Sequence, residues 1–237
     1  MNLKDKVAIL SGSTGALGTA VTQSFLDAGA RVVALYSRES SLESLKTKVT
    51  QNSERLSAIR TDVLNEASVQ GMVKEVLENH RTIDILVNLV GGFFGGVSIV
   101  ETSEEQWDKM MGLNLKSVFL CCRNVLPAMM KQKSGRIITM GSRSGVNAVS
   151  GMSAYSASKA GLINFTEALA AEGRARNITA NVVIPSIMDT SDNRKAMPDA
   201  NFANWVKVEM IAETILFLCS ETAGDINGAV IPVYGKS

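Results

Sequence analysis

Tyr155 and Lys159 stand four residues apart in the small-residue stretch Ser153–Ala160. On a helix, side chains at this spacing lie on the same face, so the phenol and the ammonium group can interact. A neighbouring positive charge favours the phenolate and lowers the pKa of a tyrosine, which lets its hydroxyl transfer a proton near neutral pH. Such a pair is usually structural when it stands alone, so its meaning depends on the residues that accompany it.

A glycine-rich turn near the N-terminus could bind a phosphate. Gly12, Gly15 and Gly18 lie between the apolar run Val7–Leu10 and a helical pattern that begins at Ala16. At such a junction, backbone amides and the positive end of the helix can hold a pyrophosphate. A tight turn needs glycine with or without a ligand, but this turn follows the first predicted strand, where dinucleotide-binding folds carry their phosphate site. The sequence therefore predicts a dinucleotide site.

The residues after the second predicted strand bear on the choice of cofactor. In a dinucleotide-binding fold this strand end meets the adenosine ribose, and an acidic residue there selects an unphosphorylated 2′-hydroxyl. Here the strand is followed by Tyr36, Ser37 and Arg38, with no carboxylate among them. A hydroxyl and a guanidinium can bind a 2′-phosphate, so NADP(H) is favoured. The alternative is a solvated Arg38 at the start of a helix, with NAD(H) as the cofactor.

An alternating series of strands and helices must position these residues. Short apolar runs typical of buried parallel strands alternate with helical patterns along the chain. This alternation predicts an α/β protein: a single-domain Rossmann fold, with a doubly wound seven-stranded parallel sheet and helices on both faces. A capping-box pattern at Ser103–Gln106 marks the start of a long helix. The expected strands are 7–10, 32–35, 56–59, 83–87, 136–140, 178–184 and 229–233, and the expected helices are 16–28, 42–49, 69–77, 103–130, 152–173 and 208–220.

Composition and charge limit the possible functions. The chain has 237 residues, 46% of them hydrophobic and 20% charged, with no internal repeat and no apolar run long enough to cross a membrane. We therefore expect one catalytic domain over residues 1–237 and no membrane partner. A formal charge of +1 argues against a nucleic-acid partner. The three cysteines cannot all pair and lack the spacing of a metal site, and the N-terminus has no signal-peptide pattern. We expect a cytoplasmic protein without a metal.

Taken together, these motifs resemble those of the classical short-chain dehydrogenase/reductase family over essentially the whole chain. Ser142 matches the catalytic serine after the fifth strand and Asn114 the asparagine of the long fourth helix. With Tyr155 and Lys159 they complete the family's tetrad. The resemblance implies that Ser142 and Tyr155 hydrogen-bond a substrate carbonyl and that Tyr155 donates the proton. It also implies that Lys159 binds the nicotinamide ribose and lowers the tyrosine pKa, while Asn114 holds a helix distortion and a water next to Lys159.

The same resemblance implies which residues contact the cofactor. The glycine turn corresponds to the family's phosphate loop, Asp62-Val63 to its adenine contact, and Asn88–Gly91 to the motif after the fourth strand. Pro185–Thr190 corresponds to the segment that holds the nicotinamide carboxamide. The expected cofactor-binding residues are Gly12, Ser13, Thr14, Gly15, Leu17, Gly18, Tyr36, Ser37, Arg38, Asp62, Val63, Asn88, Val90, Gly91, Tyr155, Lys159, Pro185, Ile187 and Thr190. The chain departs from the family's pattern at Ala16, Leu89, Val90 and Ser186.

The function that this resemblance implies is the NADP(H)-dependent reduction of a carbonyl, as in 3-oxoacyl-[acyl-carrier-protein] reductases, on a small molecule such as an acyl thioester or another ketone. Two alternatives stay open: an NAD(H)-dependent alcohol dehydrogenase, and a non-catalytic dinucleotide-binding regulator that needs no tetrad. Substrate selection is expected in a loop over about 186–207 and in segments 91–96 and 144–152. Phe93 and Phe94, between glycine pairs, favour either an apolar pocket wall or a packed loop. Helices 103–130 and 152–173 resemble the family's subunit interface, which implies a homotetramer or a dimer.

Overall fold

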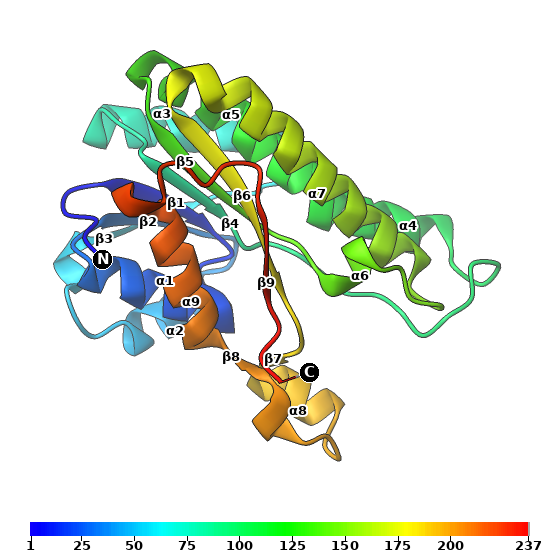
Figure 1. Ribbon diagram of the computed structural model, residues 1–237. Helices are drawn as coiled ribbons and strands as arrows, with labels where there is room; N and C mark the ends of the chain where they lie inside the picture. The colour runs from blue at the N-terminus through cyan, green and yellow to red at the C-terminus, as the bar shows by residue number, and fades with distance from the viewer. Residues whose placement is uncertain (237) are drawn as a thin grey trace.

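Seven parallel strands form one sheet in the computed structural model, which describes residues 1–236 (Figure 1). Their order is β3-β2-β1-β4-β5-β6-β9, so the direction of winding reverses between β1 and β4. Open α/β sheets bind ligands at the carboxyl ends of the strands where the order reverses. The predicted doubly wound sheet is confirmed. The strands are β1 (Val7–Ser11), β2 (Arg31–Tyr36), β3 (Leu56–Arg60), β4 (Ile85–Asn88), β5 (Gly135–Met140), β6 (Ile178–Pro185) and β9 (Val230–Val233).

Helices cover both faces of this sheet (Figure 1). Ala8 and Leu10 of β1 pack with α1, α2 and α9, whereas Val7 and Ile9 pack with α3, α5 and α7. Because both faces are buried, β1, β2 and β4 carry nearly continuous apolar runs rather than alternating ones. No helix within residues 1–236 is long and apolar enough to span a membrane. The helices are α1 (Ala16–Asp27), α2 (Glu39–Lys48), α3 (Glu66–His80), α4 (Glu104–Met111), α5 (Ser117–Gln132), α6 (Arg143–Val146), α7 (Ser153–Gly173), α8 (Ser191–Ala196) and α9 (Val208–Cys219).

The long helix predicted over residues 103–130 is interrupted. Its capping box is confirmed, because Ser103 Oγ accepts from the Gln106 amide and Gln106 Oε1 accepts from the Ser103 amide. After α4 the chain makes a π-helical turn, Gly112–Lys116, and then continues as α5 through Pro127. Single π turns inside helices occur frequently at functional sites. This one contains Asn114, whose side chain is fully buried.

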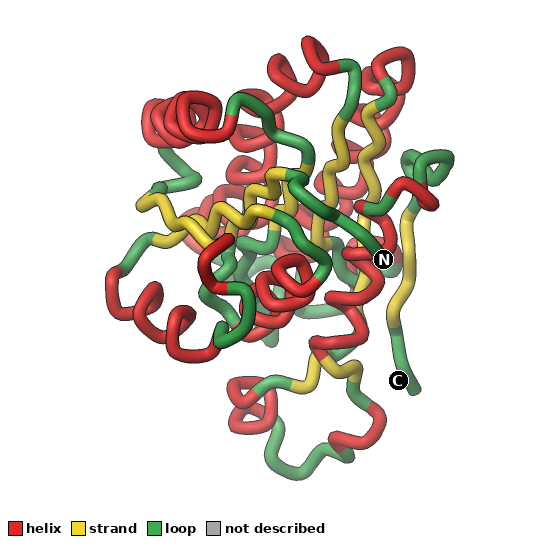
Figure 2. The backbone as a smooth tube through the Cα atoms, turned by 90° about the vertical axis from the view of Figure 1, so that its left-hand side faces the viewer, coloured by secondary structure: helices red, strands yellow, loops and turns green. Residues whose placement is uncertain are grey.

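Two short strands were not expected from the sequence. The strands β7 (Met188–Asp189) and β8 (Val206–Lys207) pair in parallel and enclose residues 190–205. Figure 2 shows this segment, which includes α8, as a loop that projects from the main body and is held at its neck by the two strands. A two-residue strand is too short to produce a hydrophobic period. The pair fixes both ends of the segment in which substrate selection is expected.

Candidate active site

Two glycines allow the turn after β1 to pack against its neighbours. Gly12 has a φ of 69°, and a Cβ atom there would lie 2.8 Å from backbone atoms of Leu89 and Val90. A Cβ atom on Gly18 would lie 2.1 Å from the carbonyl oxygen of Gly12. Only glycine combines the positive φ with this close approach at position 12. The turn therefore lies directly against the end of β4, at the point where the strand order reverses.

The start of α1 leaves donors for an anion. Gly15 is the N-cap of the helix, and no side chain caps it. The first backbone amides of a helix have no intrahelical acceptor, and the helix dipole adds positive potential there. Gly15 is exposed, Thr14 is half-buried and Ser13 Oγ donates to the Leu35 carbonyl at 3.0 Å, which ties the turn to β2. Leu17 is a core residue at 8% exposure. The turn thus has the shape and the free donors that a pyrophosphate requires.

The residues after β2 contain a carboxylate that sequence analysis overlooked. Tyr36 Oη donates to Glu39 Oε1 at 3.0 Å. Tyr36, Ser37 and Arg38 contain no carboxylate, as expected, but Glu39 in the first turn of α2 lies next to them and contacts the strand end. This hydrogen bond raises the pKa of Tyr36. Ser37 and Arg38 are exposed, and Arg60, the register partner of Tyr36 on β3, adds a second guanidinium that only the parallel pairing reveals.

The residues that follow β3 and β4 are held by local hydrogen bonds. Asp62 Oδ1 accepts from the Leu64 amide at 2.9 Å, and Val63 is half-buried. Asn88 is buried at the end of β4, where its Nδ2 donates to Cys122 Sγ at 3.7 Å. Among the described residues, its Oδ1 has no hydrogen-bond partner. These residues lie at the strand ends, as the motif positions predict.

Asn114 joins the loop after β4 to helix α7. Its Oδ1 accepts from the Gly92 amide at 2.8 Å, and its Nδ2 donates to the Gly92 carbonyl at 3.1 Å and to Ser158 Oγ at 3.0 Å. A Cβ atom on Gly91 would lie 3.0 Å from Asn114 Oδ1 and 3.5 Å from Lys159 Nζ. Gly91, Asn114 and Lys159 therefore converge at one point. The π turn is what directs Asn114 towards this point.

Lys159 is an almost fully buried ammonium group. Its Nζ donates to the Met140 carbonyl at the end of β5 at 2.7 Å, and the residue is 5% exposed. Burial lowers the pKa of Lys159 from 10.5 to about 8. Gly145 of α6 lies against the lysine, since a Cβ atom there would come within 2.8 Å of its backbone carbon. Contacts with β5 and α6 thus hold the Lys159 side chain.

Ser142 directly precedes α6, and Tyr155 lies in the first turn of α7. Ser142 is the N-cap of α6, and its Oγ accepts from the Ser144 amide at 3.3 Å. Burial raises the pKa of Tyr155, and a hydrogen bond with Ser142 partly opposes that rise. The expected lowering of the tyrosine pKa by Lys159 is not found in this geometry, in which the ammonium donates to Met140. The four tetrad residues nevertheless lie around the ends of β4 and β5.

The buried Lys159 predicts a pH dependence of stability. In the unfolded chain the lysine retains the usual pKa of 10.5, whereas in the folded chain the pKa is about 8. Between these pH values the unfolded state binds the extra proton, so the free energy of unfolding rises with pH. The free energy of unfolding of the wild type, measured relative to that of Lys159→Met, should rise by about 3 kcal/mol between about pH 7 and 11.

Chemical denaturation of both proteins across this pH range measures the difference, because the other titrating groups cancel. A difference that stays flat, or that falls as the pH rises, would contradict the assigned burial of the ammonium group.

The predicted nicotinamide segment lies beside a depression of about 400 Å³. Pro185 is buried at the end of β6, Ile187 is 39% exposed, and Thr190 Oγ1 caps α8 by accepting from the Asn193 amide at 3.2 Å. Arg194 of α8 makes a bidentate ion pair with Asp189, at 2.6 and 2.8 Å. The depression is lined by Asp189, Thr190, Ser191, Arg194, Lys207 and Glu209.

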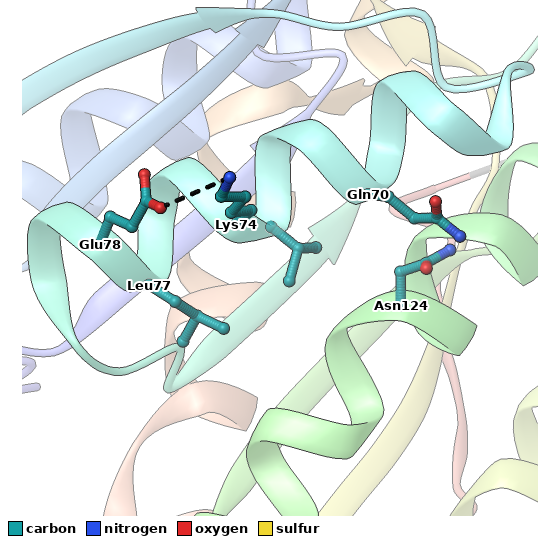
Figure 3. A pocket seen from close by; sticks show the side chains of 6 residues that line it. Gln70, Lys74, Leu77, Glu78 and Asn124 are labelled. Atoms are coloured by element: carbon teal, nitrogen blue, oxygen red, sulfur yellow. Dashed lines mark ion pairs between the residues drawn. The ribbon is translucent and has the colours of Figure 1, made fainter.

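A second depression, of about 440 Å³, lies between α3 and α5 and is drawn in Figure 3. An exposed ion pair between Lys74 and Glu78, at 3.8 Å, lies on its α3 side. None of the residues that line this depression is a predicted site residue. The site is therefore identified by the arrangement of its side chains and not by the size of a depression. The lining residues are Gln70, Val73, Lys74, Leu77, Glu78 and Asn124.

Comparisons with known proteins agree with this arrangement. The family model described as short chain dehydrogenase matches residues 6–201. The 3-oxoacyl-[acyl-carrier-protein] reductase FabG of Escherichia coli is 31% identical over 99% of this chain and 98% of its own, and the 3-oxoacyl-[acyl-carrier-protein] reductase of Synechocystis is 33% identical over 98% and 97%. The crystal structure of gox2181 superposes with a TM-score of 0.92 at 30% identity, over 99% of this chain and 96% of that one. The chain therefore belongs to the short-chain dehydrogenase/reductase family and is one of its oxidoreductases, similar to FabG.

Proposed function

We propose that this protein uses NADP(H) to reduce a carbonyl group to an alcohol, with Ser142, Tyr155, Lys159 and Asn114 as the tetrad. The observation that carries the proposal is the convergence of Gly91, Asn114 and the buried ammonium of Lys159 near the ends of β4 and β5, against the helix that also carries Tyr155. In this proposal the hydroxyl groups of Ser142 and Tyr155 both donate to one carbonyl oxygen. The relatives' names support a 3-oxoacyl thioester, or another ketone, as the substrate.

The protonated Tyr155 can act as the general acid in the reductive direction. Bound NADPH supplies the hydride. Because burial raises the pKa of Tyr155, its hydroxyl holds a proton at neutral pH and can donate it to the carbonyl oxygen as that oxygen gains negative charge. Ser142 Oγ donates a second hydrogen bond to the same oxygen, which stabilises the developing charge. Lys159, with a pKa of about 8, is mainly protonated at neutral pH and places a positive charge near Gly91 and Asn114.

The residues around the predicted cofactor site fit NADP(H). The glycine turn and the uncapped start of α1 suit a pyrophosphate, and the exposed Arg38 can pair with a 2′-phosphate. Glu39 is the residue that would oppose this phosphate, but its carboxylate accepts from Tyr36. Arg60 adds a positive charge beside Tyr36. The balance of charge therefore favours NADP(H) over NAD(H).

Removal of the Arg38 guanidinium tests the cofactor assignment. We expect Arg38→Ala to weaken NADPH binding about 10-fold or more and to leave NADH binding nearly unchanged, because only NADPH carries the 2′-phosphate. Titration of both cofactors, followed by energy transfer from Trp107 and Trp205 to the nicotinamide, measures the two affinities. Lys48→Ala, at the opposite end of the same helix, is the matched control for the loss of one positive charge.

Equal losses for the two cofactors in Arg38→Ala would contradict the role of this residue. Tighter binding of NADH than of NADPH by the wild type would favour the NAD(H)-dependent alcohol dehydrogenase instead.

We also propose that residues 1–237 act as one catalytic domain, with substrate selection in the segment over about 186–207, and that the protein is a homotetramer. All predicted site residues lie on strands, turns or helices that belong to one seven-stranded sheet and its covering layers, which supports a single domain. The outer face of α5 and α7 supports the homotetramer. Phe119 on this face is 40% exposed, and its ring meets the ring of Phe165 edge to face, with centroids 6.2 Å apart. Such an exposed aromatic pair suits a contact with a second subunit.

A further inference from the structure

Phe93 has an unusual place beside the proposed proton donor. Its ring meets the ring of Tyr155 edge to face, with centroids 5.0 Å apart and an interplanar angle of 76°. Phe93 is nevertheless 64% exposed. A large aromatic side chain that is exposed at a catalytic position adds apolar area that a ligand can cover. The edge-to-face contact therefore holds the Phe93 ring next to Tyr155, while much of the surface of the Phe93 ring remains exposed.

The loop that carries Phe93 is built to keep the ring there. A Cβ atom on Gly95 would lie 3.0 Å from both Phe93 Cζ and Met152 Cγ, so glycine leaves the space that these two side chains occupy. The Gly96 amide donates to the Gly151 carbonyl at 2.9 Å. This bond ties the loop after β4 to the segment just before α7. The two segments together form one wall beside Tyr155.

This wall carries no ionisable side chain. Residues 91–100 and 144–154 contain no Asp, Glu, Lys, Arg or His. The nearest positive charge in the sequence, Arg143, has its guanidinium over the Tyr234 ring at 5.4 Å. Apart from the Lys159 ammonium near Gly91, these two segments offer no charged partner to a carboxylate or phosphate, so desolvation of such a group against the Phe93 ring is unfavourable. The wall therefore suits an uncharged group.

We propose that Phe93 is a specificity-determining residue, whose exposed ring packs against an uncharged, apolar group attached to the carbonyl carbon of the substrate. This inference rests on the proposed carbonyl reduction and narrows its substrate class to ketones with an apolar arm. Oxo acids with a carboxylate next to the carbonyl are poor substrates. For a 3-oxoacyl thioester, the acyl tail lies on Phe93, and the charged carrier portion lies outside segments 91–100 and 144–154.

A chain-length series tests this inference. The substrates are the linear methyl ketones from butanone to octanone and the α-oxo acid with the same chain length as octanone. The reduction of each is measured with NADPH. For the wild type, kcat/KM should rise along the ketone series and be lowest for the oxo acid. Phe93→Ala should lower kcat/KM about 10-fold for octanone but less than about 3-fold for butanone, because only the longer arm reaches the ring. Phe93→Leu, which keeps an apolar side chain, should retain part of the chain-length dependence.

Phe94→Ala is the matched control, since it removes a neighbouring ring from the same loop. NADPH affinity and thermal stability of Phe93→Ala should equal those of the wild type. An equal loss for all ketones, an unchanged chain-length series, or the same pattern in Phe94→Ala would overturn the role of Phe93. In each of those results the wild type still reduces ketones, so the proposed function stands. A wild type that binds NADPH but reduces neither these ketones nor a 3-oxoacyl thioester contradicts the proposed function, and the inference with it; reduction of the thioester alone, with none of the ketones, overturns only the inference.

Discussion

Replacement of Tyr155 by phenylalanine is expected to lower kcat by about 10³-fold, because general acid catalysis by a positioned group contributes roughly 10²- to 10⁴-fold. The substitution removes one oxygen atom and keeps the ring, so that the edge-to-face contact with Phe93 remains. The carbonyl oxygen then loses its proton donor and one of its two hydrogen bonds. Single-turnover oxidation of NADPH with a saturating ketone measures the effect on the chemical step.

NADPH affinity separates this catalytic effect from a structural one. Tyr155→Phe should bind NADPH within about twofold of the wild type, since the phosphate turn and Arg38 are untouched. Full activity in this variant would show that Tyr155 is not the proton donor. Loss of cofactor binding together with activity would assign the residue a structural role. A wild type that binds the cofactor and never turns over would favour the non-catalytic regulator.

Gly18→Ala should destabilise the fold by about 3 kcal/mol and weaken NADPH binding, because overpacking of a close-packed site forces the backbone to move. A Cβ atom at this position would lie 2.1 Å from the Gly12 carbonyl oxygen and 2.6 Å from the Ser13 backbone. These are backbone atoms, which cannot rotate away as a side chain can. Urea denaturation followed by circular dichroism measures the change in the free energy of unfolding.

Gly71→Ala is the matched control for this substitution. Gly71 lies inside α3, and a Cβ atom there would meet nothing within 4 Å. The same chemical change should therefore stabilise the protein, by up to about 1 kcal/mol, through the higher helix propensity of alanine. If Gly18→Ala unfolds at the same urea concentration as the wild type, the close contact between the start of α1 and the turn is not present in solution.

Local patterns predicted most elements, and the errors have identifiable physical causes. Helix α3 begins three residues earlier than its first predicted residue, Val69, because the Asn65 side chain caps it by accepting from the Ser68 amide at 3.0 Å. Hydrophobic spacing alone does not register a polar cap. The π turn around Asn114 agrees with the helix distortion that the family resemblance implies, although hydrophobic spacing predicts one continuous helix over residues 103–130.

The sequence by itself determined the doubly wound sheet and the candidate residues of the site, because strand and helix periods and short motifs are local properties of the chain. Only the tertiary structure decided how those residues interact. It places the Lys159 ammonium on the Met140 carbonyl, raises the pKa of Tyr155 by burial, pairs Tyr36 with Arg60 across the sheet and lays Phe93 on the Tyr155 ring. Desolvation and contacts between distant segments arise only when the chain is folded, so no local pattern contains them.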